Sequence, residues 1–296
     1  MFFSFFEIDA HTSGVCRSMK DIERLIDILK GMGGAVVACS GGVDSTFLLK
    51  LAALSGIRAL AVTSASPSHP EGDVRAAGEM AAAIGVPHRT ISTGELENPA
   101  YSSNGPDRCY HCKNELFAAL RRIAEEEGLQ SVIDGSTSDD RLDFRPGLKA
   151  ALAHGVRSPL MEAGLGKDEI RRYSKRLGLP TWDKPSSPCL ASRVPYGTPI
   201  TEERLRRIGL AEEALRGLGL KVFRVRDHGA VARLEVAREE FQFAFDARDE
   251  ILKKLKTHFE FVSLDLEGFR TGSLNRLLDL PPDEGGRRAG DENEKD

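Results

Sequence analysis

The chain has 296 residues, a length that predicts one large domain and one smaller one. Apolar residues make up 41% and charged residues 29%, as in an ordinary globular protein, and the net charge of −4 argues against a general nucleic-acid binder. No apolar run is long enough to span a bilayer, and residues 1–6 lack the basic segment of a secretory signal. We therefore expect a cytoplasmic protein with no stable nucleic-acid partner and no membrane partner.

Apolar runs and amphipathic periodicities alternate along the first half of the chain. Short apolar runs predict buried strands, and apolar residues that recur every three or four positions predict helices. The predicted strands are 35–39, 59–63, 89–92 and 131–134, and the predicted helices are 20–31, 47–51, 72–84 and 113–127. Strands that alternate with helices indicate an α/β fold, with a doubly wound, mostly parallel sheet covered on both faces.

Five prolines interrupt this alternation between residues 180 and 199, so we place a domain boundary there. Beyond it, the patterns predict a helix over 201–218, a hairpin of strands 221–226 and 231–236, a helix near 246–256 and a strand near 259–266. We divide the chain into an N-terminal extension (1–18), a nucleotide-binding domain (19–195), a smaller α+β domain for substrate binding and oligomerisation (196–280) and a disordered tail (281–296).

The strongest motif is a Ser-Gly-Gly-Val-Asp-Ser loop between a predicted buried strand and a predicted helix. It consists of Ser40, Gly41, Gly42, Val43, Asp44 and Ser45. Glycines allow close approach of a ligand, and the unpaired N–H groups at a helix start attract anions. The two serines add hydroxyl donors, and Asp44 can hold Mg²⁺ or cap the helix. The alternative is a plain Gly-Gly turn. The loop matches neither the Walker A nor the dinucleotide pattern. It resembles the PP-loop of ATP pyrophosphatases, which bind the pyrophosphate end of ATP and transfer AMP to an acceptor oxygen.

Three of the five cysteines, Cys109, Cys112 and Cys189, are candidates for metal or thiol chemistry. The first two form a Cys-x-x-Cys pair within 108–113, which we place in a loop just ahead of a helix. Cys189 lies in the proline-rich connection. Three thiolates would leave one position of a metal or cluster open for chemistry. A redox pair, a structural zinc with a histidine as fourth ligand and an iron–sulfur site all remain possible on these residues alone.

Charged residues supply the remaining candidates. Asp139 follows a predicted strand, at the carboxyl edge of the sheet where ligands bind. The alternative is a solvent-exposed turn, which would have the same sequence pattern. Arg224 and Arg226 lie two apart and share one face of a predicted strand, and Glu235 lies on the partner strand. Arginine suits phosphate or carboxylate binding, and the alternative is a cross-strand ion pair.

Taken together, these motifs resemble the LarE family of ATP-dependent sulfur transferases, within the PP-loop ATP pyrophosphatase superfamily. The matching segments are 40–45, 98–99 with 108–112, 135–140 and 188–193, and the resemblance covers roughly residues 20–275. It implies that the protein uses ATP and Mg²⁺ to adenylylate the carboxylates of a pyridinium dicarboxylate mononucleotide. It further implies that these become thiocarboxylates in biosynthesis of the nickel-pincer nucleotide cofactor.

The resemblance also implies roles for single residues. Some members sacrifice the sulfur of the cysteine that matches Cys189, whereas members with three cysteines bind a 4Fe-4S cluster. With Cys109, Cys112 and Cys189, this chain resembles the cluster-dependent type. The catalytic candidates are Cys189 and Asp44, and Glu235 is expected to help bind a metal. The expected substrate-binding residues are Ser192, Arg193, Arg224, Arg226 and Asp139.

The resemblance implies a homo-oligomer, often a hexamer, and does not identify the sulfur donor. Three rival functions share parts of the pattern. A tRNA thiolation enzyme would also use a PP-loop and cysteines, but the acidic net charge argues against it. An amide-forming ligase would not need three cysteines, and a nucleotide-binding module with a structural zinc is the non-enzymatic alternative.

Overall fold

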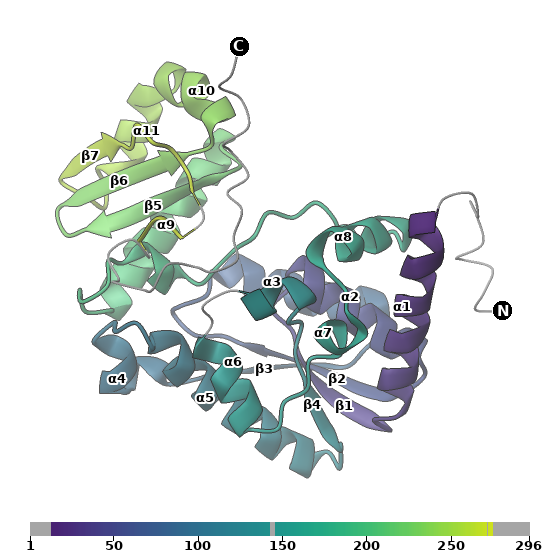
Figure 1. Ribbon diagram of the computed structural model, residues 1–296. Helices are drawn as coiled ribbons and strands as arrows, with labels where there is room; N and C mark the ends of the chain where they lie inside the picture. The colour runs from purple at the N-terminus through teal and green to yellow at the C-terminus, as the bar shows by residue number, and fades with distance from the viewer. Residues whose placement is uncertain (1–12, 143–145, 271, 275–296) are drawn as a thin grey trace.

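Four parallel strands form the larger of two sheets in the computed structural model, which describes residues 13–142, 146–270 and 272–274. The strand order is β3-β2-β1-β4. The bounds are β1 Gly34–Ala38, β2 Arg58–Ser64, β3 His88–Ile91 and β4 Ser131–Ile133. The chain crosses from strand to strand through helices, which confirms the predicted doubly wound α/β fold (Figure 1).

Helices cover both faces of this sheet (Figure 1). One layer contains α1 (Ser13–Lys30), α2 (Val43–Leu54), α3 (Glu71–Ile84), α7 (Pro159–Ala163) and α8 (Lys167–Arg176). The other contains α5 (Arg108–Glu126) and α6 (Pro146–Ala153). The central strand β1 serves both layers: Ala35 and Val37 pack in the first core, and Val36 packs in the second. Its unbroken apolar sequence is what a strand buried on both faces requires.

Several helices differ from the sequence-based prediction. Helix α1 begins at Ser13, so the predicted extension 1–18 is partly helical. Helices α4 (Pro99–Ser102), α6, α7 and α8 were not predicted. In α8 the reason is plain, because this strongly charged helix buries only Ile170, Tyr173 and Ser174. Residues 1–12 and the predicted tail 281–296 lie outside the described residues.

A second, smaller sheet of three strands has the order β5-β6-β7. Strands β5 (Phe223–His228) and β6 (Val231–Val236) form the predicted antiparallel hairpin, and β7 (Phe261–Leu264) runs parallel to β6. Helices α9 (Glu202–Leu218), α10 (Phe241–Asp246) and α11 (Arg248–Leu255) complete a separate apolar core with this sheet. None of the helices in the described part of the chain combines the length and the apolar composition that a bilayer crossing requires.

A third apolar cluster lies where the proline-rich connection meets the larger unit. It joins Tyr101 of α4 to residues of the connection and of α9, namely Leu190, Ala191, Val194, Ile200, Leu205 and Ile208. The fully buried Asn104, which has a positive φ of 61°, donates to the carbonyl oxygens of Pro195 and Thr198, both at 2.8 Å. The domain boundary that we predict at 195/196 therefore falls in a packed part of the chain, not in a free linker.

Candidate functional site

The glycine-rich loop joins the carboxyl end of β1 to the start of α2. Gly41 has a φ of +69°, and a Cβ there would lie 3.2 Å from both the Ala77 side chain and the Asp73 carbonyl oxygen. Only glycine fits this position without strain. Across the turn, the hydroxyls of Ser40 and Ser45 lie 3.1 Å apart, and Gly42 caps the helix. Both hydroxyls and the N-terminal N–H groups of α2 thus lie in one turn, as an anion site requires.

The segment after β4 packs directly against this loop. A Cβ on Gly135 would lie 3.0 Å from the backbone nitrogen of Ser45 and 3.2 Å from its Cα. The segment continues into a 3₁₀ turn, η3 (Ser138–Leu142). There the Asp139 carboxylate accepts a hydrogen bond from the Lys167 backbone N–H at 2.7 Å, at the start of α8. Asp139 therefore lies after β4 as predicted, but its contact is a helix-capping one.

Replacement of Gly135 with alanine is expected to weaken ATP binding by at least about 10-fold and to destabilise the fold by about 1–3 kcal/mol. The added Cβ would collide with the backbone at the start of α2 and displace the anion site. Calorimetric titration with ATP and urea unfolding measure both effects. Gly72→Ala is the matched control, because a Cβ there meets nothing within 4 Å. Equal ATP affinity in the two variants would contradict the close packing of residue 135.

Two cysteines lie in the first two turns of a helix, which corrects the sequence-based prediction. Helix α5 begins at Arg108, so Cys109 and Cys112 are helical and not in a preceding loop. Asp107, a favourable residue just before a helix, lies at the start of α5. Because α5 ends shortly before β4, its N-terminus lies at the carboxyl edge of the sheet, where the glycine-rich loop also lies.

Cys189 approaches the same place from the proline-rich connection. It immediately precedes the 3₁₀ turn η4 (Leu190–Arg193), and its side chain packs with that of Cys112 on the cluster around Tyr101. Burial raises the pKa of the Cys112 thiol to about 12, and Cys189 and Cys109 add to this shift. Cys189 and Cys109 thus lie close enough to Cys112 to affect its ionisation. Within the described ranges there is no group of three or more His, Cys, Asp or Glu side chains arranged around one metal ion.

Arg193 fixes the backbone on both sides of Cys189. Its guanidinium is 1% exposed and forms a two-pronged ion pair with Glu212 of α9, at 2.9 and 3.0 Å. The same group donates to the carbonyl oxygens of Pro188 at 2.6 Å and Cys189 at 3.2 Å. Every side-chain nitrogen of Arg193 is thus bonded within the chain. This arrangement fits a positioning residue better than the substrate contact that we expected.

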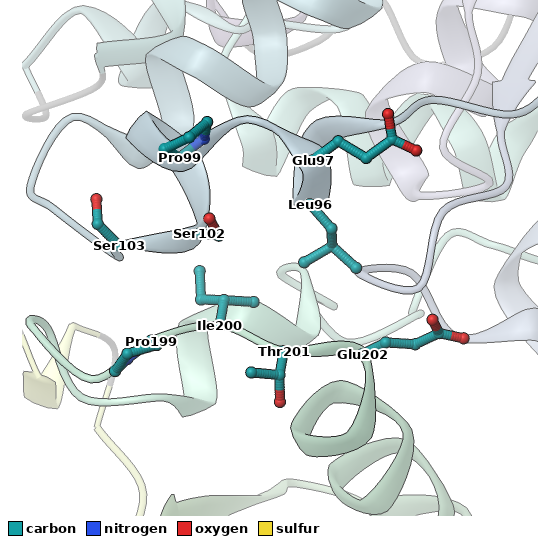
Figure 2. A pocket seen from close by; sticks show the side chains of 9 residues that line it. All are labelled: Leu96, Glu97, Pro99, Ser102, Ser103, Pro199, Ile200, Thr201 and Glu202. Atoms are coloured by element: carbon teal, nitrogen blue, oxygen red, sulfur yellow. The ribbon is translucent and has the colours of Figure 1, made fainter.

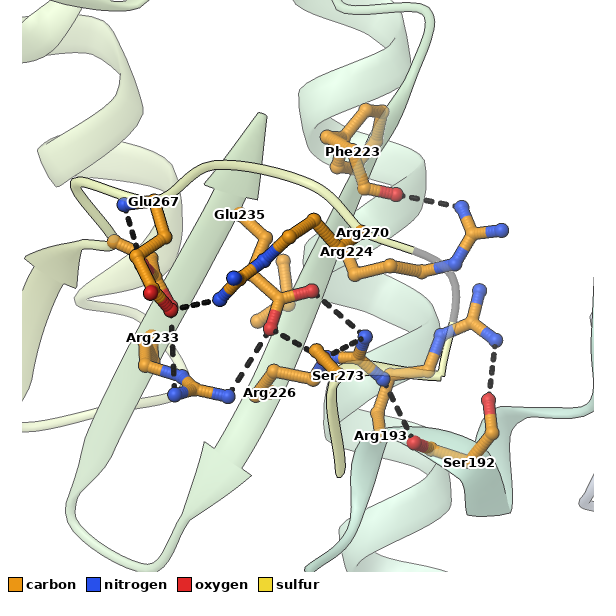
Figure 3. A network of polar contacts seen from close by, with 12 residues as sticks. Ser192, Arg193, Phe223, Arg224, Arg226, Arg233, Glu235, Glu267, Arg270 and Ser273 are labelled. Atoms are coloured by element: carbon orange, nitrogen blue, oxygen red, sulfur yellow. Dashed lines mark hydrogen bonds and ion pairs between the residues drawn. The ribbon is translucent and has the colours of Figure 1, made fainter. Parts of the chain in front are cut away.

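Five arginines form a cluster that lies next to Glu235 and Ser192 (Figure 3). They are Arg193, Arg224, Arg226, Arg233 and Arg270. Arg226 donates to the carbonyl oxygen of Ser192 at 2.8 Å and pairs with Glu235 at 2.7 Å. Arg224 donates to the carbonyl oxygen of Ser186 at 2.7 Å. The fully buried Glu235 also accepts from Arg233 and Ser273, so its two oxygens are engaged within the chain. The cross-strand ion pair that we weighed as an alternative is therefore present.

Positively charged groups lie close together in this arginine cluster. Burial lowers the pKa of Arg224 to about 10, and Arg193 and Arg226 lower it further, with Glu212 acting in the opposite sense. In the described part of the chain, the Nε atoms of Arg226, Arg233 and Arg270 are buried without a hydrogen-bond partner. Cationic groups that repel one another and retain unused donors favour an anionic ligand.

Sequence reasoning missed two charged residues near these sites. Lys184 donates to the Gly41 carbonyl oxygen at 3.1 Å, but nothing in its proline-rich surroundings signals that contact. Glu95 is 1% exposed, and its Oε1 has no hydrogen-bond partner in the structure. Its charge contributes to the raised pKa of Cys112, after burial and Cys189, so it lies near the thiols. Glu95 sits in an unremarkable polar stretch of sequence and could not be singled out from it.

A shallow pocket of about 610 Å³ opens between the two units (Figure 2). One wall comes from the segment that leads into and through α4, with Leu96, Glu97 and Pro99, and the other from the start of α9, with Ile200 and Glu202. None of the predicted site residues lines it. The candidate site is therefore the carboxyl edge of the larger sheet together with the arginine cluster, and not this pocket.

Comparison with known proteins gives clear relatives, although no family model matches the chain. The chain is 44% identical over 261 residues to an uncharacterized protein of Synechocystis sp., a match that covers 87% of this chain and 97% of that protein. It is 35% identical over 257 residues to pyridinium-3,5-bisthiocarboxylic acid mononucleotide synthase of Lactiplantibacillus plantarum, covering 86% and 93%. Among solved structures, NMN synthetase from Francisella tularensis matches with a TM-score of 0.45 and 22% identity, over 60% of this chain and 76% of that one.

Proposed function

Because this chain belongs to the LarE family, that of pyridinium-3,5-bisthiocarboxylic acid mononucleotide synthase, we propose that it is an ATP-dependent sulfur transferase. Its substrate in this proposal is a pyridinium dicarboxylate mononucleotide, whose carboxylates become thiocarboxylates for the nickel-pincer nucleotide cofactor. One observation carries the proposal: the anion-binding loop and the three cysteines lie at the same carboxyl edge of one sheet. A carboxylate bound there would be within reach of both ATP and sulfur.

The first half-reaction belongs to the glycine-rich loop. The N–H groups at the start of α2 and the hydroxyls of Ser40 and Ser45 bind the pyrophosphate end of ATP. Asp44, in the first turn of α2, is the residue that would hold Mg²⁺. A substrate carboxylate attacks the α-phosphorus, pyrophosphate leaves, and the acyl carbon now carries AMP as a good leaving group. The hydrogen-bond donors of the loop stabilise the charge that develops on the departing pyrophosphate.

The second half-reaction belongs to the cysteines. Cys109, Cys112 and Cys189 fit a 4Fe-4S cluster because they supply three soft thiol ligands from two neighbouring elements and leave a fourth position open. When bound, such a cluster would supply a transferable sulfur at its open position. Arg193 holds the Cys189 backbone in place for either source of sulfur, the cluster or the Cys189 thiolate itself. If the sulfur is a bound sulfide, displacement of AMP would give the thiocarboxylate directly. If it is the Cys189 thiolate, displacement of AMP gives a thioester, and elimination across its Cα–Cβ bond then breaks the Cβ–S bond, releases the thiocarboxylate and leaves dehydroalanine at position 189.

The arginine cluster is the proposed binding site for the phosphate of the substrate. We assign the phosphate of the mononucleotide to Ser192, Arg224 and Arg226, where two guanidinium groups lie close together and the Nε of Arg226 has no hydrogen-bond partner. Binding energy from this remote phosphate positions the carboxylate at the reacting centre. A metal at Glu235, which the family resemblance implies, would replace one of its present contacts to Arg226, Arg233 or Ser273.

We also propose that the protein works in the cytoplasm as a homo-oligomer. The support is a set of exposed apolar side chains on the smaller unit, namely Phe243, Phe245, Phe261 and Leu266. Apolar surface of this kind favours burial between subunits.

The proposal is tested by anaerobic turnover with ATP and the pyridinium mononucleotide. The expected products are one AMP and one pyrophosphate for each thiocarboxylate formed, from a protein that contains iron and labile sulfide. Intact mass separates the two sulfur sources: several turnovers at unchanged protein mass indicate a cluster, and loss of about one H₂S indicates a sacrificed Cys189. Formation of AMP without any sulfur in the product would contradict the proposed function.

A further inference from the structure

The pyrophosphate end of ATP carries several negative charges, yet the loop that would bind it contains no cationic residue. Residues 39–45 include neither lysine nor arginine, whereas a Walker A loop carries a lysine for this purpose. Backbone N–H groups and Mg²⁺ offset part of the charge. A lysine or arginine from elsewhere in the chain would offset more, provided that the fold brings it to the loop.

Lys184 is such a residue. Its ammonium group donates to the carbonyl oxygen of Gly41 at 3.1 Å and pairs with Asp73 at 3.0 Å. Its charge also lowers the pKa of neighbouring Cys39, although burial outweighs this effect and the net shift is upward. The side chain is 27% exposed, so it lies partly out of solvent. Lys184 thus reaches the loop from a position 143 residues further along the chain.

The backbone around Lys184 is held firmly. Arg171 of α8 donates to the carbonyl oxygens of Trp182 and Lys184, both at 2.9 Å. On the other side, Ser187 donates to Asp73 at 3.0 Å. A side chain whose backbone is fixed in this way loses little further entropy when it binds a ligand.

We propose that Lys184 is a binding residue for the pyrophosphate end of ATP. An ammonium group has three N–H donors, and the contacts to Gly41 and Asp73 engage two of them. We assign the third donor to a phosphate oxygen bound in the loop. The ammonium group of Lys184 would also stabilise the charge that develops on pyrophosphate as it leaves. This inference rests on the proposed function, because it assumes that the loop binds ATP.

The test compares Lys184→Met with the wild-type protein by calorimetric titration against three ligands. These are the non-cleavable analogue α,β-methylene-ATP, pyrophosphate alone and AMP. We expect Lys184→Met to weaken binding of the first two by about 10- to 100-fold, the loss of one charge-assisted hydrogen bond, and AMP binding by less than about twofold. Lys184→Arg should restore much of the affinity for the analogue. Lys175→Met is the matched control, because Lys175 stacks on Trp182 at 4.3 Å and has no contact with the loop.

The outcomes separate this inference from the proposed function. Equal affinity of wild type and Lys184→Met for the analogue would overturn the role of Lys184 and leave the ATP-binding loop intact. An equal loss of AMP affinity, with a lowered melting temperature, would show that Lys184 only holds the fold, and would also overturn it. A wild-type protein that binds no ATP analogue at all would overturn the proposed function together with this inference.

Discussion

Replacement of Cys189 with alanine is expected to abolish thiocarboxylate formation while the protein still releases pyrophosphate from ATP in the presence of the pyridinium substrate. The thiol is lost, but the glycine-rich loop between β1 and α2 keeps its glycines and the paired hydroxyls of Ser40 and Ser45. The expected loss of sulfur transfer is at least about 10³-fold, since a covalent or ligating sulfur has no substitute at this position. Separate assays of pyrophosphate and of thiocarboxylate by mass spectrometry measure the two half-reactions.

Cys39→Ala is the matched control, because Cys39 is a buried free cysteine that we assign to the apolar core. It should retain sulfur transfer. Cys109→Ala and Cys112→Ala then distinguish the source of sulfur. Both should be as inactive as Cys189→Ala if a cluster is required, and both should retain a single turnover if Cys189 gives up its own sulfur. Normal sulfur transfer by Cys189→Ala would remove the cysteines from the mechanism.

Replacement of Arg193 with alanine is expected to destabilise the protein by about 3–5 kcal/mol, because it leaves the buried carboxylate of Glu212 without its main partner. It should also remove sulfur transfer in whatever protein remains folded, since the carbonyl oxygens of Pro188 and Cys189 lose their donor. Urea unfolding, followed by far-UV circular dichroism, measures the first effect. Single-turnover assays in the absence of urea measure the second.

Arg216→Ala provides the comparison for this variant. Arg216 contacts the same Glu212 at 3.6 Å, but its side chain is 47% exposed, so its removal should cost less than about 1 kcal/mol. A similar loss of unfolding free energy in the two variants would show that burial does not strengthen the ion pair of Arg193 with Glu212. A stable Arg193→Ala protein with normal sulfur transfer would contradict the positioning role.

The larger fold could be predicted because its signals are local. The apolar run of β1 and the two glycines after it determine a strand, a tight turn and a helix start within a few residues. The hairpin of β5 and β6 was likewise predictable from alternation around a single turn. By contrast, α8 was not predicted, because it carries charge on most of its surface, although its three buried side chains, Ile170, Tyr173 and Ser174, have helical spacing.

The site was only partly predictable, for a different physical reason. The sequence motifs identify which residues are chemically suitable, but their roles depend on partners far along the chain. The family resemblance predicts Arg193 as a substrate contact, but in the folded chain its guanidinium group pairs with Glu212. Asp139 lies at the expected edge of the sheet, yet its carboxylate accepts a hydrogen bond from the backbone N–H of Lys167 at the start of α8. Lys184 could not be found at all, since only the folded chain brings it to Gly41.

The ion pair between Arg193 and Glu212 also limits how this protein can be divided. Arg193 lies before residue 195 and Glu212 lies after it. A cut at the predicted boundary would therefore leave each fragment with one charged group that has lost its buried partner. Neither half would then be a self-sufficient module. Recombination of this nucleotide-binding half with a different substrate-binding half would succeed only where the incoming partner restores a carboxylate at the position of Glu212.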